Sequence, residues 1–397
     1  MTKPKIKIFS FFAGSGFLDL GFELSGFEIV YVNELYSPFM EAYRYSRKLL
    51  KLSSPEYGYH QGEKGDVKQL VTGKTALNLG ELIKDARKDC HIVGFIGGPP
   101  CPDFSIGGKN RGIHGDNGQL SGAYIELICQ QQPDFFLFEN VKGLYKTNKH
   151  RLFFETLKSQ LKDANYFLTE RLINAIEYGV PQTRERIILI GFHRNLINAL
   201  NFNNQSKNID CINQIFPWNK YIIFPRSQVF SYPWITTTPF AENSVFPFPG
   251  NVPIDLTVEH WLHKNQVNNH PNAQHYFKPR AGLKRFLSVD EGDDSKKSYK
   301  RLHRWRYSPT ACYGNNEVHL HPYRARRISV AEALAIQSLP KEFIFPDCIS
   351  LTAMFKTIGN GVPYLASKSL AMMINDFLNN PVDSIQISEE KQLELLF

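Results

Sequence analysis

IKIFSFFAGSGF, residues 6–17, runs from a short apolar segment into a turn that carries two glycines. The apolar part is dense in isoleucine and phenylalanine and too short for a helix, which is typical of a strand buried on both faces of a parallel sheet. Glycines in the turn that follows let a ligand approach the backbone where a helix begins. The segment therefore predicts the first strand and a ligand-binding turn of an α/β domain.

Runs of the same kind recur along the first half of the chain, separated by stretches with helical periodicity. The strand-like runs are 28–32, 92–96, 135–138 and 187–192, and the helix-like stretches are 38–52 and 151–164. This alternation predicts a doubly wound, Rossmann-like α/β domain. Residues 364–378 have amphipathic helical spacing, so we expect the end of the chain to return to this domain.

The amino-acid composition changes near residue 195, after which a proline- and aromatic-rich span leads into a basic stretch. We expect residues 1–194 and 345–397 to form the large domain and residues 195–344 a smaller irregular one. Residues 194–344 hold 19 Lys and Arg against 11 Asp and Glu, which accounts for the whole net charge of +8. A localised basic surface indicates a polyanionic partner such as nucleic acid, although a solvated basic face remains an alternative.

Composition excludes several classes of protein. With 42% hydrophobic and 21% charged residues the chain is typical of a folded globular protein. No apolar run approaches the roughly 20 residues of a membrane span, and the first residues lack a signal-peptide pattern. The six cysteines are scattered without a CxxC pair, which favours a reducing compartment and argues against a zinc site or a disulfide framework.

GGPPCPDFS, residues 97–105, is the most specific segment. It follows the run ending at Ile96, so Cys101 should lie at the carboxyl edge of the sheet, where α/β domains bind ligands. Prolines on both sides restrict the backbone and present one thiol rigidly. We therefore predict that Cys101 is a nucleophile and that the other five cysteines are ordinary hydrophobic residues. The basic loop GGKNRG, residues 107–112, is suited to closing over a phosphate backbone.

Acidic side chains end three segments of the same pattern. Glu34 lies about 20 residues after the glycine turn, where an acid can bond to the ribose hydroxyls of an adenosine-containing cofactor. Asp66 follows the next segment and is placed to hold an adenine amino group. Glu139 ends an apolar strand, so burial should raise its pKa and keep a proton available near neutral pH.

QTRER, residues 182–186, places two arginines two positions apart. In an extended segment both side chains point to one face, where they can donate to a carbonyl and orient the acid at 139.

Six blocks in this order resemble the DNA cytosine-C5 methyltransferase family. They are FAGSG at 12–16, Asn-Glu at 33–34, Pro-Cys at 100–101, ENV at 139–141, QTRER at 182–186 and IGNGVP at 358–363. RISVAEALAIQ, residues 327–337, is similar to the penultimate block of that family. Together they cover nearly the whole chain except residues from about 195 to 300.

The resemblance implies an enzyme that transfers a methyl group from S-adenosylmethionine to C5 of cytosine in a specific duplex DNA sequence. Cys101 would attack C6, Glu139 would protonate N3 and Arg186 would hold O2, with Arg184 orienting its neighbours. The base would be flipped out of the duplex to react. The residues implied at the cofactor are Phe12, Ala13, Gly14, Ser15, Gly16, Glu34, Asp66, Val67, Pro100, Asn360 and Val362. The residues expected to contact DNA are Ser105, Lys109, Arg111, Gln182, Lys284, Arg285, Arg301 and Arg304.

The same resemblance sets the expected partners. We expect double-stranded DNA as the partner, S-adenosylmethionine as the cofactor, and no metal and no membrane. The protein should be a monomer in the bacterial cytoplasm, associated with the nucleoid. It should belong to a restriction-modification system with a separately encoded endonuclease.

Three positions depart from the family pattern. Pro102 stands where glutamine is usual, and Phe17 stands where glycine is usual. Where many members have Asp-x-Arg-Gly, this chain has Asp116-Asn117-Gly118, so the arginine is missing. None of these changes touches Cys101, Glu139 or Arg186, so we still expect activity.

Other functions fit the sequence less well. An RNA (tRNA) cytosine-C5 methyltransferase shares the catalytic blocks but lacks a large basic insertion. A silent DNA-binding protein would not need the intact Cys, Glu and Arg set. An adenine amino-methyltransferase needs an Asn/Asp-Pro-Pro-aromatic loop, and this chain has Pro-Pro-Cys.

Overall fold

A computed structural model describes residues 5–88, 91–100, 116–200, 212–279, 283–296, 298–313 and 317–379. Within these ranges one seven-stranded sheet has the order β3-β2-β1-β4-β5-β7-β6. The strands are β1 (Ile6–Phe11), β2 (Glu28–Glu34), β3 (Tyr59–Gln61), β4 (Ile92–Gly97), β5 (Phe135–Val141), β6 (Tyr166–Asn174) and β7 (Glu185–His193). All five strand-like runs of the sequence are strands of this sheet.

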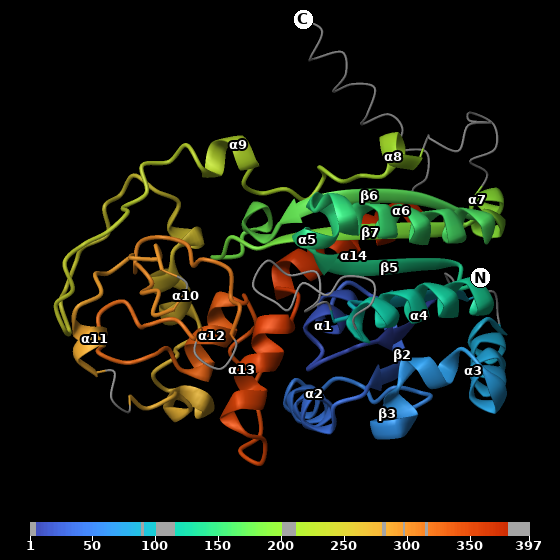
Figure 1. Cartoon of the computed structure of the whole chain (residues 1–397), viewed down its shortest axis with the longest axis horizontal. Helices are drawn as coiled ribbons and strands as arrows, with labels where there is room; N and C mark the ends of the chain where they lie inside the picture. The colour runs from blue at the N-terminus through green and yellow to red at the C-terminus, as the bar shows by residue number, and fades with distance from the viewer. Residues whose placement is uncertain are drawn as a thin grey trace, which may run out of the picture.

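Helices cover both faces of the sheet, as a doubly wound fold requires (Figure 1). On one face, Phe95 and Phe138 pack with α3 (Gly73–Ala86), α4 (Asp116–Gln131) and α6 (Asn148–Asp163). On the other, Ile8 and Phe192 pack with α1 (Phe17–Glu23) and α14 (Tyr364–Asn379). The remaining helices near the sheet are α2 (Ser37–Leu49), α5 (Lys142–Lys146), α7 (Arg194–Ala199) and α8 (Ile212–Ile215).

The sheet is mixed, which corrects the expectation that every apolar run belongs to a parallel sheet. Strand β7 lies antiparallel between β5 and β6. The chain turns from β6 into β7 through the 3-10 turn Ala175–Tyr178 and Gly179 at φ 84°, without a crossover helix. A short connection of this kind can join only antiparallel strands. Strand β6 had no clear signal in the sequence, because its buried and half-buried residues follow no regular alternation.

The C-terminal helix returns to the large domain, as expected. Helix α14 lies against α1, and Ser367 Oγ donates to Leu18 O at 2.5 Å. A Cβ on Gly21 would lie 2.3 Å from Ser367 Oγ, so only glycine permits this approach.

The boundary expected at residue 195 does not coincide with a change in packing. Phe216 and Trp218 join the same core cluster as the sheet residue Phe192, and Trp218 Nε1 donates to Thr169 Oγ1 at 2.8 Å. At the other end, α12 (Val330–Ile336) and α13 (Leu351–Asn360) share one core with residues of α1 and α2. Packing on the sheet core therefore continues at least to Ile222, and residues on both sides of position 345 share one core.

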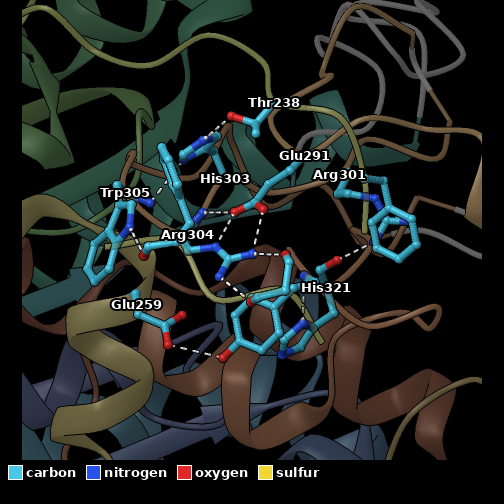
Figure 2. A network of polar contacts seen from close by, with 12 residues as sticks. Thr238, Glu259, Glu291, Arg301, His303, Arg304, Trp305 and His321 are labelled. Carbon is cyan, nitrogen blue, oxygen red and sulfur yellow. Dashed lines mark hydrogen bonds and ion pairs between the residues drawn. The ribbon is translucent and has the colours of Figure 1, made fainter. Parts of the chain in front are cut away.

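The region from about 225 to 329 contains little regular structure in its described part. Its helices are α9 (Arg226–Val229), α10 (Val258–Lys264) and α11 (Leu283–Leu287), joined by long irregular segments on the left of Figure 1. Buried arginines hold these segments together (Figure 2). Arg304 forms a bidentate ion pair with Glu291, with Nε–Oε1 at 2.9 Å and Nη2–Oε2 at 2.8 Å. It also donates to Ser244 O at 2.7 Å and Ser244 Oγ at 2.8 Å.

Arg301 also connects irregular segments through hydrogen bonds. Its guanidinium donates to the carbonyl oxygens of Val289 at 2.8 Å and Arg324 at 3.1 Å, and to those of Phe286 and His321. Burial lowers the pKa of Arg301 to about 10, so it stays charged at neutral pH.

The structure therefore corrects the expectation that Arg301 and Arg304 contact DNA phosphates. Their side chains are buried and their donors are used by protein oxygens. A backbone without helices or strands leaves carbonyl oxygens to be satisfied, and the guanidinium fork satisfies several at once. Lys284 and Arg285, on α11, are exposed.

No helix among the described residues is both long and apolar enough to cross a membrane.

Arg304→Met should lower the free energy of unfolding by about 3–5 kcal/mol, because it leaves the Glu291 carboxylate buried without its partner. Urea denaturation at pH 7 measures this, and Lys284→Met, at an exposed site, should change stability by less than about 0.5 kcal/mol.

Burial raises the pKa of Glu291, but hydrogen bonds from Arg304 outweigh it and leave the pKa below its ordinary value of 4.5. The contribution of the pair is therefore complete above pH 4.5 and lost as the pH falls through the folded-state pKa. The stability gap between the wild type and Arg304→Met should narrow in that acidic range. A gap that stays constant there would contradict the assignment of the pair.

Candidate active site

The Glu139 carboxylate lies against the backbone that leads into the Pro-Cys loop. Strands β4 and β5 are parallel neighbours, and Gly97 is level with Phe138, so Gly98, just after β4, lies beside Glu139 of β5. A Cβ on Gly98 would lie only 2.7 Å from Glu139 Oε2. The glycine therefore makes room for the carboxylate at the start of the loop.

Asn140 joins the same two segments. Its Nδ2 donates to Pro99 O at 3.4 Å, and its Oδ1 accepts from Val141 N at 2.8 Å. Sequence reasoning gave Asn140 and Gly98 no separate role, although both stand inside the quoted motifs.

Arg186 pairs with Glu139. Strand β7 runs antiparallel to β5, and Arg186 Nε lies 2.9 Å from Glu139 Oε1. Burial raises the pKa of Glu139, and the charges of Arg186 and Arg184 only partly offset this effect. The direction predicted from the apolar strand is confirmed. The side chain is 7% exposed, so this acid is almost fully removed from water.

Arg184 holds three backbone carbonyls. Its Nη1 donates to Ala311 O at 3.0 Å, and its Nη2 donates to Gly359 O at 2.8 Å and Asn360 O at 3.3 Å. Burial and the neighbouring Arg186 charge lower its pKa to about 9, so it remains a cation at neutral pH. Arg184 therefore connects the strand that carries Arg186 to the loop that carries Asn360.

Gln182 belongs to this framework rather than to a DNA-facing surface, which corrects its expected role. Its side chain is fully buried, with Oε1 accepting from Ala311 N at 3.0 Å and Nε2 donating to Gln337 Oε1 at 3.3 Å. An amide with both ends used inside the protein cannot reach a base edge.

Glu34 organises the glycine turn. Its Oε2 accepts from Gly14 N at 2.9 Å and its Oε1 from Tyr36 N at 2.8 Å. Burial raises its pKa, and these N–H groups together with Lys356 work in the opposite direction. Gly14 and Gly16 have φ of 57° and 84°, and a Cβ on Gly16 would lie 2.6 Å from the Tyr43 ring. Both turn glycines are thus required by the backbone.

Asp66, another residue implied at the cofactor, lies near Glu34. A Cβ on Gly65 would lie 2.5 Å from Glu34 O, which places Asp66 beside the end of β2. The Asp66 side chain caps the following 3-10 turn by accepting from Lys68 N at 3.0 Å. Val67 is buried in the core, Phe12 has φ 52°, and Pro100 is exposed.

Segments from the N-terminal and C-terminal parts of the described chain meet at this turn. Ser15 Oγ lies 2.7 Å from Thr357 Oγ1, on the helix that ends at Asn360. The buried ring of Phe17 occupies the space that a Cβ on Gly361 would need, at 2.2 Å. The unusual Phe17 is therefore accommodated by a glycine near the other end of the chain, next to the buried Val362.

Several predicted residues lie outside the described ranges. They are Cys101, Pro102, Ser105, Lys109 and Arg111. Asn117 is the second residue of α4, and its side chain is not described.

Three comparisons bear on this site. The family model for C-5 cytosine-specific DNA methylases matches residues 6–376. Type II methyltransferase M.NmeDI of Neisseria meningitidis is 56% identical over 95% of this chain and 85% of its own, and M.NgoPII of Neisseria gonorrhoeae is 29% identical over 95% and 97%. A solved DNA modification methyltransferase encoded within an E. coli prophage covers 95% of the chain with 20% identity and a TM-score of 0.60, a likeness of fold alone.

Gly98→Ala should reduce the turnover of methyl transfer roughly 10- to 100-fold, because the new methyl group displaces the Glu139 carboxylate. Gly122→Ala on α4 is the matched control, since nothing lies within 4 Å of its Cβ. Steady-state kinetics and thermal midpoints of both variants measure the effect. Full turnover by Gly98→Ala would show that catalysis does not require the Glu139 carboxylate to lie beside Gly98.

The family match spans residues 6–376, nearly the whole described chain. Within this range Glu139 of β5, Arg186 of β7 and Arg184, just before β7, are joined to the helix that ends at Asn360, and that helix contacts the Gly14 turn. The chain belongs to the C-5 cytosine-specific DNA methylase family and is a DNA (cytosine-5-)-methyltransferase.

Proposed function

We propose that the protein methylates C5 of cytosine in a specific duplex DNA sequence through a covalent bond from Cys101 to C6. The observation that carries the proposal is the buried Glu139–Arg186 pair at the backbone of Gly98, three residues before Cys101. An acid and a cation held together in a dry site suit a ring that must be protonated and held at once.

Each residue has a defined chemical task in this scheme. The Cys101 thiolate adds to C6 of the flipped base while Glu139 gives a proton to N3, which makes C5 electron-rich. Arg186, beside Glu139, donates to O2. After C5 has been methylated, the C5 proton is removed and the C6–sulfur bond breaks, which restores the ring and the free thiol. Arg184 is a positioning residue that holds the strand of Arg186 in register.

The turn at 12–16 and its neighbours fit S-adenosylmethionine. Gly14 and Gly16 carry no side chain in the turn, and Glu34 lies at the edge of the turn with Asp66 next to it. We assign Phe12, Glu34, Asp66, Pro100, Asn360 and Val362 to this cofactor, with Glu34 on the ribose and Asp66 on the adenine. When bound, the cofactor supplies an activated methyl group.

DNA recognition is assigned to residues within 195–344, in the described part after residue 222. The exposed Lys284 and Arg285 are the members of the expected DNA-contacting set that the described surface retains. Since similar proteins are named Type II methyltransferases, we propose that this enzyme protects DNA in a restriction-modification system, as a monomer, with an endonuclease encoded separately.

Glu34→Ala should weaken S-adenosylmethionine binding by about 1.5–3 kcal/mol, the usual contribution of a charge-assisted hydrogen bond. Isothermal titration calorimetry measures the affinity, and Glu28→Ala, at the other end of β2, should leave it unchanged. If the wild type and Glu34→Ala bind S-adenosylmethionine with equal affinity, Glu34 does not bind the ribose.

Duplex DNA with 5-fluorocytosine at the target position should become permanently linked to the protein, only when S-adenosylmethionine is present. Fluorine at C5 cannot leave as a cation, so the C6–sulfur bond persists after methylation. Bisulfite sequencing of DNA from a methylation-free host that expresses the protein first identifies the target. Denaturing gels and peptide mapping should then locate the adduct at Cys101.

Two variants and one substrate control complete this test. Cys101→Ser should give no adduct, because a hydroxyl is too weakly acidic to add at C6. Glu139→Gln should form it far more slowly. RNA of the same sequence should not react. An adduct on another residue would overturn the assignment of Cys101, and reaction with RNA alone would favour an RNA methyltransferase.

A further inference from the structure

The loop 241–248 is fastened to the irregular region at several successive positions. Asn243 N donates to Tyr323 O at 2.7 Å, and both oxygens of Ser244 accept from Arg304. Trp305 Nε1 donates to Phe246 O at 2.8 Å. Figure 2 shows Arg304 and Trp305 directed toward these contacts. The loop therefore has a rigid backbone although it contains no helix or strand.

Aromatic contacts add to this attachment. The Phe246 ring meets His303 at a centroid distance of 6.2 Å, and the Phe248 ring meets Trp305 at 5.3 Å. Residues on both sides of position 245 are thus held by their backbones and their rings.

Val245, between these attachments, is 94% exposed. A single exposed apolar residue is common on protein surfaces and by itself indicates nothing. Here the flanking residues are fixed, and Asn243 takes a left-handed conformation with φ 56°. A rigid loop that presents an apolar side chain loses little conformational entropy when that side chain meets a partner.

The residues that hold the loop also continue into the catalytic framework. Five residues after His303, Ser308 N donates to Pro181 O at 2.8 Å, and Ala311 O accepts from Arg184. One short segment, 303–311, therefore contacts loop 241–248 at one end and, through Arg184, the start of the strand of Arg186 at the other. Any partner of the loop is placed in a fixed position relative to the active site.

The exposed charge of the region favours a polyanionic partner. Residues 194–344 carry all of the net positive charge of the chain, and cations such as Lys284 and Arg285 are exposed although Arg301 and Arg304 are buried. Arg324 stands between Tyr323, which accepts from Asn243 N, and Ala325, whose N donates to Glu242 Oε1 at 3.2 Å. A rigid apolar tip in a basic region suits a duplex, whose phosphates flank the base edges.

We propose that loop 241–248 reads base edges of the DNA target and that Val245 is the side chain that makes this apolar contact. Arg304 and Trp305 are positioning residues that hold the loop. This assignment rests on the proposed function, because it names the part of the recognition region that selects the sequence.

The test compares sequence preference in three variants. Val245→Ala shortens the tip, Trp305→Phe removes the donor to Phe246 O but keeps an aromatic ring, and Leu152→Ala on α6 is a control at a residue 73% exposed. Each protein methylates a DNA library with randomised positions around the cytosine that the wild type methylates. Bisulfite sequencing then gives the relative rate for every base at every position.

Val245→Ala should change the relative rates for different bases at one or more positions by at least about fivefold, the scale of one lost base contact. Trp305→Phe should change the same positions, and Leu152→Ala should match the wild type. If both loop variants keep the wild-type preference within about twofold, the proposal is wrong. It is also wrong if they bind all sequences more weakly without a change in preference.

Failure of the proposed function would look different. In that case the wild type would leave the library unmethylated. Selection of bound sequences from the same library, by wild type and Val245→Ala, would then test the loop independently. Identical selected sequences would overturn the loop assignment, and different ones would support it.

Discussion

A buried carboxylate needs a cation beside it and space to lie in, and the arrangement of this site follows from meeting both needs at Glu139. Arg186 supplies the charge from an antiparallel strand, and Gly98 supplies the space. Burial still raises the pKa of the acid, which favours the protonated form, and Arg186 fixes its position. The same glycine lies three residues before Cys101, so the position of the acid depends on the backbone that leads to the Pro-Cys segment.

Buried arginines are a second feature on which the structure depends. Arg184 donates to three carbonyls from two segments at the active site, and Arg301 and Arg304 bind backbone carbonyls in the irregular region. Segments without helices or strands cannot satisfy their own backbone groups. The guanidinium fork reaches several oxygens at once, and Glu291 balances part of the charge. Much of the basic character of this region is therefore structural.

The glycine turn is held by segments that lie far apart in the sequence. Ser15 contacts Thr357, and Phe17 fills the space above Gly361. Arg184 then connects the C-terminal end of α13 to the start of β7. The glycine turn, the acid and the irregular region share one network of contacts, so the order in which the blocks occur in the sequence is unrelated to their distance in space.

The sequence by itself determined the elements that local pattern controls: the strand-like runs, the glycine turn, the acid at the end of β5 and the return of the C-terminal helix. Each depends on residue spacing over a few positions, which the chain carries without its partners. Tertiary structure decided the direction of β7, the packing of residues 212–222 on the sheet, and the burial of Gln182, Arg301 and Arg304. A charged side chain looks the same in sequence whether it faces water or a carbonyl, because its partner, such as Glu291 or Ala311, is chosen by contacts between distant segments.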